Sequence, residues 1–171
     1  MAVNPSQSPL VAVDANVLFD LADELDDVVD AMSLICDRLP GAKLMIPPTA
    51  QHELANWALH GGIVQKRQTA QKAIRVARTR RILPANLFAI SHGIAERIAR
   101  RLRDVELLPE EELHDAFIVS ESALLRCSIL LTSDEHLRGI DFERLTFELR
   151  AFDLGAPVIA TPREIVIKFF R

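Results

Sequence analysis

Short apolar runs alternate along this chain with longer stretches in which apolar residues recur every three or four positions. The short runs are typical of buried strands, and the longer stretches are typical of helices with one buried side. Strands are expected at residues 11–13, 43–46, 129–131 and 157–160. Because a helical stretch separates each run from the next, the pattern predicts an α/β fold with a parallel sheet covered on both faces.

Local signals set the expected limits of the helices. One helix is expected from Val17 to Leu39, where Pro40-Gly41 ends it, and Thr49 is expected to cap the next one. Residues 143–154 suit either a helix or a strand, and a helix is favoured. Thr161-Pro162-Arg163-Glu164 forms a capping box that opens a C-terminal helix. Further helices are expected at 63–81, 91–107, 110–126 and, as a single turn, 135–139.

The charge of the chain is concentrated in one segment. From Lys66 to Arg103 there are eleven Lys and Arg residues and one acid, Glu96, so this stretch carries +10 and the remainder −14 of the net −4. We expect its helices, at about 63–107 and separated by an irregular stretch at 83–86, to form an excursion from the sheet. They either bind phosphates or are solvated helices whose arginine stems cover apolar surface. The candidate phosphate-binding residues are Arg67, Arg75, Arg78, Arg81, Arg97 and Arg101.

Length and composition predict a single domain spanning 1–171. The chain has 171 residues, of which 49% are hydrophobic and 26% charged, enough to form one ordinary core. The first ten residues lack the features of a signal peptide, and no stretch approaches the roughly 18 apolar residues of a membrane span, so a soluble, cytoplasmic protein is expected. Cys36 and Cys127 are expected to be buried, reduced thiols, and Trp57 is expected in the core.

Four acidic residues lie where apolar runs end. Asp14 follows the first predicted strand, Glu53 follows the second, Asp115 lies near a helix start, and Asp134 follows the run at 129–131. The carboxyl ends of parallel strands share one edge of a sheet, and Mg²⁺ and Mn²⁺ prefer oxygen ligands. A single Asp in such a place is more often a helix cap, but four converging acids would repel one another unless a cation lay between them. We therefore predict a carboxylate metal site.

Two neutral side chains accompany the first and last acids. Asn16 and Thr132 could orient a carboxylate or a metal-bound water. Equally, they could be a turn residue and a strand-end hydroxyl. Both interpretations remain open from the sequence.

Taken in order, these motifs resemble the PIN-domain ribonuclease family. The resemblance rests on residues 13–18 (VDANVL), Pro47-Pro48-Thr49 with Glu53-Leu54, His114-Asp115-Ala116, Leu131-Thr132-Ser133-Asp134 and residues 158–162 (VIATP). It implies a three-layer α/β/α fold and a magnesium- or manganese-dependent endoribonuclease with Asp14, Glu53, Asp115 and Asp134 as its acids. Many small bacterial members are VapC-like toxins of type II toxin-antitoxin pairs, so it also implies RNA as substrate, an antitoxin protein partner and a homodimer.

The resemblance also implies roles for the four acids in phosphodiester hydrolysis. Asp14, Asp115 and Asp134 would hold the metal, and Glu53 would act through water. This sequence departs from many members in carrying Ala15 in place of Ser or Thr, and its basic segment is longer than that of compact toxins.

Two other classes fit parts of the sequence. The run around Asp14 is similar to that of haloacid-dehalogenase-type phosphatases, but these carry an acid two positions later, where this chain has Asn16. An amide cannot donate the proton that such a phosphatase needs. The second alternative is a PIN-like module that binds RNA or protein without cutting.

Overall fold

The computed structural model describes residues 8–169, so the expectation about the first ten residues falls largely outside the described part. A five-stranded sheet forms the centre of the molecule, with strand order β3-β2-β1-β4-β5, and every neighbouring pair is parallel. The strands are β1 (Leu10–Val13), β2 (Lys43–Ile46), β3 (Leu83–Pro84), β4 (Ile129–Leu131) and β5 (Val158–Ala160). The predicted parallel sheet is confirmed.

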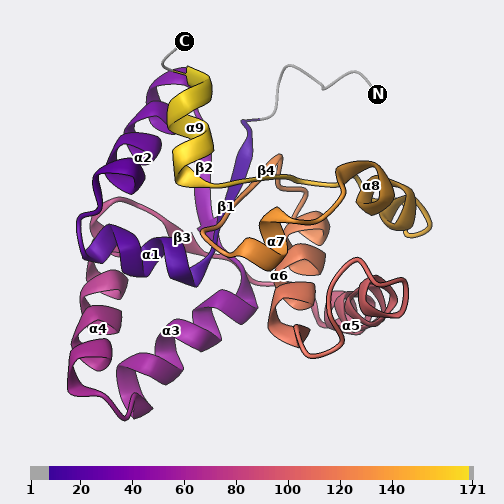
Figure 1. The fold of residues 1–171 in the computed structure, drawn as a ribbon, viewed down its shortest axis with the longest axis horizontal. Helices are drawn as coiled ribbons and strands as arrows, with labels where there is room; N and C mark the ends of the chain where they lie inside the picture. The colour runs from indigo at the N-terminus through magenta and orange to yellow at the C-terminus, as the bar shows by residue number, and fades with distance from the viewer. Residues whose placement is uncertain (1–7, 170–171) are drawn as a thin grey trace.

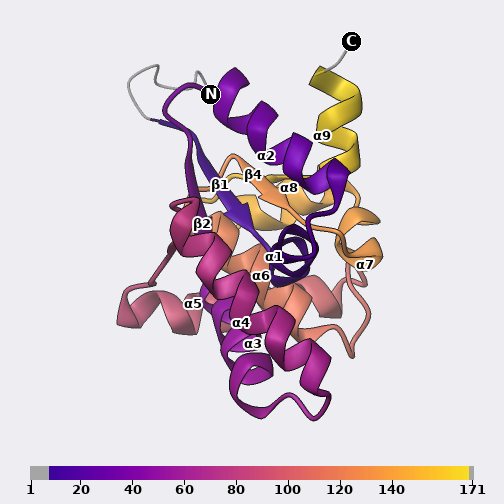
Figure 2. The same cartoon turned by 90° about the vertical axis from the view of Figure 1, so that its left-hand side faces the viewer.

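Helices cover both faces of the sheet, as Figure 1 and Figure 2 show. One layer holds α1 (Ala15–Ala22), α2 (Asp26–Arg38), α4 (Val64–Thr79) and α9 (Pro162–Phe169), and the other holds α5 (Ala89–Asp104), α6 (Leu113–Leu124) and α8 (Phe142–Arg150). Helix α3 (Pro48–His60) contacts α4 of the first layer and α6 of the second, and the short α7 (Glu135–Arg138) contacts α6. The result is the expected three-layer α/β/α sandwich.

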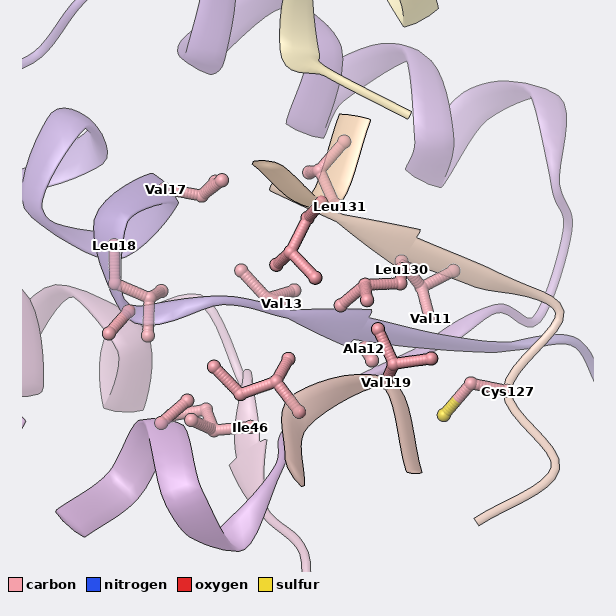
Figure 3. Packing of buried hydrophobic residues seen from close by; sticks show 14 of the residues in the cluster. Val11, Ala12, Val13, Val17, Leu18, Ile46, Val119, Cys127, Leu130 and Leu131 are labelled. Atoms are coloured by element: carbon pink, nitrogen blue, oxygen red, sulfur yellow. The ribbon is translucent and has the colours of Figure 1, made fainter. Parts of the chain in front are cut away.

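Strand β1 lies in the middle of the sheet and of the core. Val11, Ala12 and Val13 have no exposed surface, and Figure 3 shows them packed between β4 and the helices on either side. The register pairs Val13 with Leu131, so β1 and β4 end at the same level. The residues that follow these two strands therefore lie side by side at one edge. None of the helices in residues 8–169 is long and apolar enough to cross a membrane.

The single helix expected from 17 to 39 is wrong, because the chain forms two helices there. Helix α1 ends at Ala22, Glu24 adopts a left-handed backbone with φ of 58°, and α2 begins at Asp26. Acidic side chains are unfavourable at the C-terminus of a helix and favourable in its first turn. The acids from Asp23 to Asp27 therefore suit a break rather than a helix interior.

The basic segment at 63–107 contains the two expected helices but is not separate from the sheet. The stretch expected to be irregular contains β3, where Pro84 pairs with Ile46. Helix α4 packs on α1 and α3, and α5 packs on α6. Buried Ala70, Ala73 and Ala77 let α4 approach its neighbours closely, while its arginine side chains are largely exposed.

Several local predictions can be judged directly. Residues 142–150 are helical, and the capping box is present, with Glu164 accepting from the Thr161 backbone N–H at 2.9 Å. Thr49 does not cap α3, whose N-cap is Pro47. Cys127 is buried as expected, but Cys36 is exposed, contrary to the prediction, and both are free thiols.

Candidate active site

Asp14 occupies the junction between β1 and α1. Its carboxylate accepts a hydrogen bond from the Ala15 backbone N–H at 2.6 Å and another from the Thr132 hydroxyl at 2.8 Å. The side chain is 3% exposed. Burial raises the pKa of Asp14 to about 6, against the two hydrogen bonds, and the charges of Glu53 and Asp134 add to the rise. Asp14 therefore caps α1 and is also a carboxyl whose charged form is disfavoured by burial.

Thr132 connects the ends of β1 and β4. Besides donating to Asp14, its hydroxyl accepts from the Asp134 backbone N–H at 3.0 Å and lies 3.4 Å from the Asn16 amide nitrogen. The Asn16 amide oxygen accepts from the Ser133 backbone N–H at 3.1 Å. Of the two neutral residues singled out in the sequence, Thr132 contacts both strand-end acids directly, whereas Asn16 contacts Thr132 and Ser133.

Asp134 follows β4 and caps α7. One of its oxygens accepts from the backbone N–H groups of His136 at 2.7 Å and Leu137 at 3.3 Å. The helix-cap interpretation considered for isolated aspartates thus applies to both strand-end acids. Asp134 nevertheless interacts by charge with Asp14, Glu53 and Asp115.

Asp115 lies in the first turn of α6 and differs from the other acids. Its Oδ2 atom is buried and is the one buried side-chain N or O atom in residues 8–169 that lacks a hydrogen-bond partner. Burial raises the pKa of Asp115 to about 7, and the charges of Asp134 and Asp14 add to the rise. An unpartnered buried carboxylate oxygen is costly, so this atom is the best candidate for contact with a ligand.

Glu53 lies one turn into α3 and is half-buried. Burial raises the pKa of the Glu53 carboxyl, the nearby His114 opposes the rise, and the charge of Asp134 adds to it. Charge interactions therefore link all four predicted acids at the edge where β1 and β4 end.

The four acids carry the oxygen ligands that a hard divalent cation prefers. In this structure, however, their side chains do not surround one point. Among residues 8–169, no group of three or more His, Cys, Asp or Glu side chains is placed so that it could hold a metal ion. Asp14 and Asp134 use oxygens to cap α1 and α7, whereas Asp115 Oδ2 has no partner. Two raised pKa values and an orphaned oxygen are what a cation would relieve.

Two histidines that were not among the predicted site residues border the acids. His114 lies near Glu53, and His136 lies near Asp115 with its Nε2 atom 3.7 Å from Glu112. Their positions next to Asp115 and two after Asp134 are a signal that could have identified them. Glu121, a buried carboxylate on α6, had no such signal.

The six candidate RNA-binding arginines do not form one stripe. Arg67, Arg75 and Arg78 are on α4 and Arg81 follows it, whereas Arg97 and Arg101 are on α5 in the opposite layer. Arg101 is engaged by Glu148 at 2.7 Å. Trp57 is half-buried near the end of α3, with Lys66 Nζ 4.9 Å from its ring centre.

Comparison with solved structures identifies the fold. A chain of VapBC2 from Rickettsia felis, solved with a DNA fragment from its promoter, superposes with a TM-score of 0.62 at 13% identity, covering 89% of this chain and 98% of that one. A chain of VapBC-5 from Mycobacterium tuberculosis superposes with a TM-score of 0.48 at 15% identity, covering 89% of this chain and 96% of that one. No protein-family model and no curated protein matches the chain. The molecule therefore has a PIN-like, VapC-like fold.

Proposed function

We propose that this protein is a divalent-metal-dependent endoribonuclease whose catalytic acids are Asp14, Glu53, Asp115 and Asp134. Asp14, Asp115 and Asp134 would hold Mg²⁺ or Mn²⁺. The observation that carries the proposal is the buried, unpartnered Asp115 Oδ2, which lies within charge-interaction range of Asp14 and Asp134. The PIN-like fold supports the same assignment.

Each residue has a separate task in this proposal. Thr132 holds the Asp14 carboxylate in place, and Asp115 offers its free oxygen. A bound divalent ion supplies activation of water and neutralises charge on the phosphate. Glu53 is not tied by a hydrogen bond that we observe within residues 8–169, so it is free to orient the attacking water.

The phosphatase alternative is weakened by the contacts of Asn16. Its amide binds Thr132 and Ser133, and an amide cannot supply the proton for a leaving group. A PIN-like binding module that does not cut remains the rival, and the following experiment separates the two.

Purified protein should cleave single-stranded RNA in the presence of Mn²⁺ or Mg²⁺ and stop when a chelator is added. Asp14→Asn and Asp115→Asn should each lower the rate at least about 100-fold, since each removes a charge from the metal site. Gel analysis of end-labelled RNA is the measurement.

Asp141→Asn is the matched control, because Asp141 also caps a helix, accepting from Arg144 N–H at 2.8 Å, but belongs to α8. It should cleave like the wild type. RNA that is bound but never cut would favour the non-catalytic module, and cleavage that survives the chelator and both site substitutions would exclude the proposed mechanism.

The proposal extends to partners. The likeness in fold to a chain of a VapBC2 complex supports a toxin role with an antitoxin protein as inhibitor. We further propose that the free protein is a homodimer. Exposed arginines on α4 and α5 would contribute to RNA binding. Adding the purified product of a small adjacent reading frame should suppress RNA cleavage; an unchanged rate would argue against that partner.

A further inference from the structure

Helix α3, which carries Glu53, begins without a cap of its own. Its N-cap is Pro47, whose side chain makes no capping hydrogen bond, and Pro48 follows at the first helical position. The first turn of a helix exposes backbone N–H groups that need acceptors. Pro47 therefore provides no side-chain acceptor for the Thr49 N–H.

Glu121 on α6 supplies that acceptor from 72 residues away. One carboxylate oxygen accepts from the Thr49 backbone N–H at 2.9 Å, and the other accepts from the Thr49 hydroxyl at 2.8 Å. The Glu121 side chain is 4% exposed, in a stretch of α6 that is otherwise small or apolar. Burying a carboxylate costs free energy unless hydrogen bonds compensate for the lost water. Here the compensating bonds join two helices.

The Thr49–Glu121 contact joins the two helices that carry Glu53 and Asp115. Glu53 is four residues after Thr49, about one turn along α3, and Asp115 is six residues before Glu121 on α6. Among the side-chain hydrogen bonds within residues 8–169, this contact is the one that connects α3 with α6. Gln51 connects α3 to the sheet instead, through the Ile46 and Ala85 carbonyl oxygens.

We propose that Glu121 is a positioning residue that fixes α3 against α6 and thereby sets Glu53 relative to Asp115. This role rests on the proposed function for its consequence at the metal site. Glu121 itself is kept from that site by its two bonds to Thr49. The two acids of the strand ends are positioned separately, by Thr132, so the site has two independent supports.

Three variants distinguish positioning from general stability. Glu121→Ala removes both bonds to Thr49. Glu121→Gln keeps them, since its amide oxygen can accept from the Thr49 N–H while its NH₂ donates to the Thr49 hydroxyl. Ser122→Ala is the control, because it removes a buried hydrogen bond next in sequence, from the Ser122 hydroxyl to the Ile118 carbonyl oxygen at 2.7 Å, without touching α3.

The first measurement needs no metal. Nitroxide labels introduced through Asn56→Cys and Glu111→Cys, both at exposed positions, report the separation of α3 from the residues just before α6 in a Cys36→Ser background. Glu121→Ala should broaden or shift the distance distribution, and Glu121→Gln and Ser122→Ala should leave it unchanged. If the distance distribution is unchanged in Glu121→Ala, the inference is overturned, whether or not the protein binds metal.

The second measurement is Mn²⁺ affinity of the unlabelled full chain, by electron paramagnetic resonance. Glu121→Ala should raise the Kd for Mn²⁺ about tenfold, as loss of a residue that orients metal ligands does, with Glu121→Gln and Ser122→Ala within about twofold of the wild type. An unchanged Kd in Glu121→Ala overturns the inference. A wild type that binds no Mn²⁺ overturns the proposed function instead, and the label distances still decide the role of Glu121.

Discussion

Thr132 is the residue on which the geometry of the strand-end acids depends. It is fully buried, and its single hydroxyl donates to Asp14 and accepts from the Asp134 backbone N–H. No other residue type of that size provides both functions except serine. The hydroxyl therefore serves two acids that come from different strands.

Replacing Thr132 by Val should lower the free energy of unfolding at pH 8 by about 1–3 kcal/mol, because an ionised, buried Asp14 oxygen loses its donor. Thr132→Ser keeps the hydroxyl and should lose less. Urea denaturation measures both. If Val and Ser variants lose the same amount, the hydroxyl contributes nothing and packing of the methyl group explains the effect.

The four acids could be identified from the sequence by residue type and order. Their different surroundings in the folded chain could not. That Asp115 has the orphaned oxygen depends on how α6 is buried, which adjacent residues do not determine. Glu121 was missed for the same reason, since its partner Thr49 is 72 residues away. Thr132 was found because it lies two residues before an acid, Asp134, in the chain.

At the scale of elements, five helix ends share one motif. In each, the N–H of an apolar residue reaches back five residues to a helix carbonyl oxygen, and the residue just before it has positive φ. The positive-φ residues are Glu24, Arg81, Glu106, Arg126 and Asp153, and the apolar residues after them are Leu25, Ile82, Leu107, Cys127 and Leu154. Glycine is the usual residue at such a position, but in all five of these helix ends the position holds a charged residue.

This motif explains the one long helix that the sequence predicted wrongly. A glycine would have indicated the end of α1, but Glu24 does not, and the apolar spacing continues across it. The spacing over 143–154 suited either a helix or a strand, and the favoured helix is present as α8, although it ends at Arg150. Strand β3 is two exposed residues within the short run at 82–85, and the proline in that run argues against a strand.

Glu24→Gly should raise the free energy of unfolding by up to about 1 kcal/mol, because glycine adopts positive φ without the steric cost that glutamate meets. The weak contact of Glu24 with Lys72, at 3.8 Å and largely exposed, offsets little of this gain. Thermal unfolding is the measurement. Glu143→Gly, in the first turn of α8, is the control and should be destabilising; destabilisation in both would contradict the assigned backbone of Glu24.

At the scale of the whole molecule, the acids lie near the carboxyl ends of β1 and β4. The basic helices α4 and α5 belong to different layers. The sequence correctly predicted a parallel sheet covered on two faces, because buried parallel strands are unbroken apolar runs. It did not predict that α4 and α5 lie in opposite layers, since this depends on β3 joining one edge of the sheet before the chain returns to β4.

The same gathering of acids makes stability depend on pH. Asp14 and Asp115 have pKa values of about 6 and about 7, above their ordinary 3.8. Between pH 4 and 7 the folded state therefore holds more protons than the unfolded state, so the free energy of unfolding falls as pH rises. Divalent cations bind ionised carboxylates, so they should restore the free energy of unfolding that is lost as pH rises.

The most direct test of the metal site is the free energy of unfolding at pH 5 and pH 8, with and without saturating Mg²⁺, for the wild type and Asp115→Asn. Without Mg²⁺ the wild type should be less stable at pH 8 by about 2 kcal/mol, after allowing for solvent around Asp115, and Mg²⁺ should recover most of that loss. Asp115→Asn should lose less and respond little to Mg²⁺. Equal stability at both pH values, or equal stabilisation of both proteins by Mg²⁺, would contradict a cation site built on these acids.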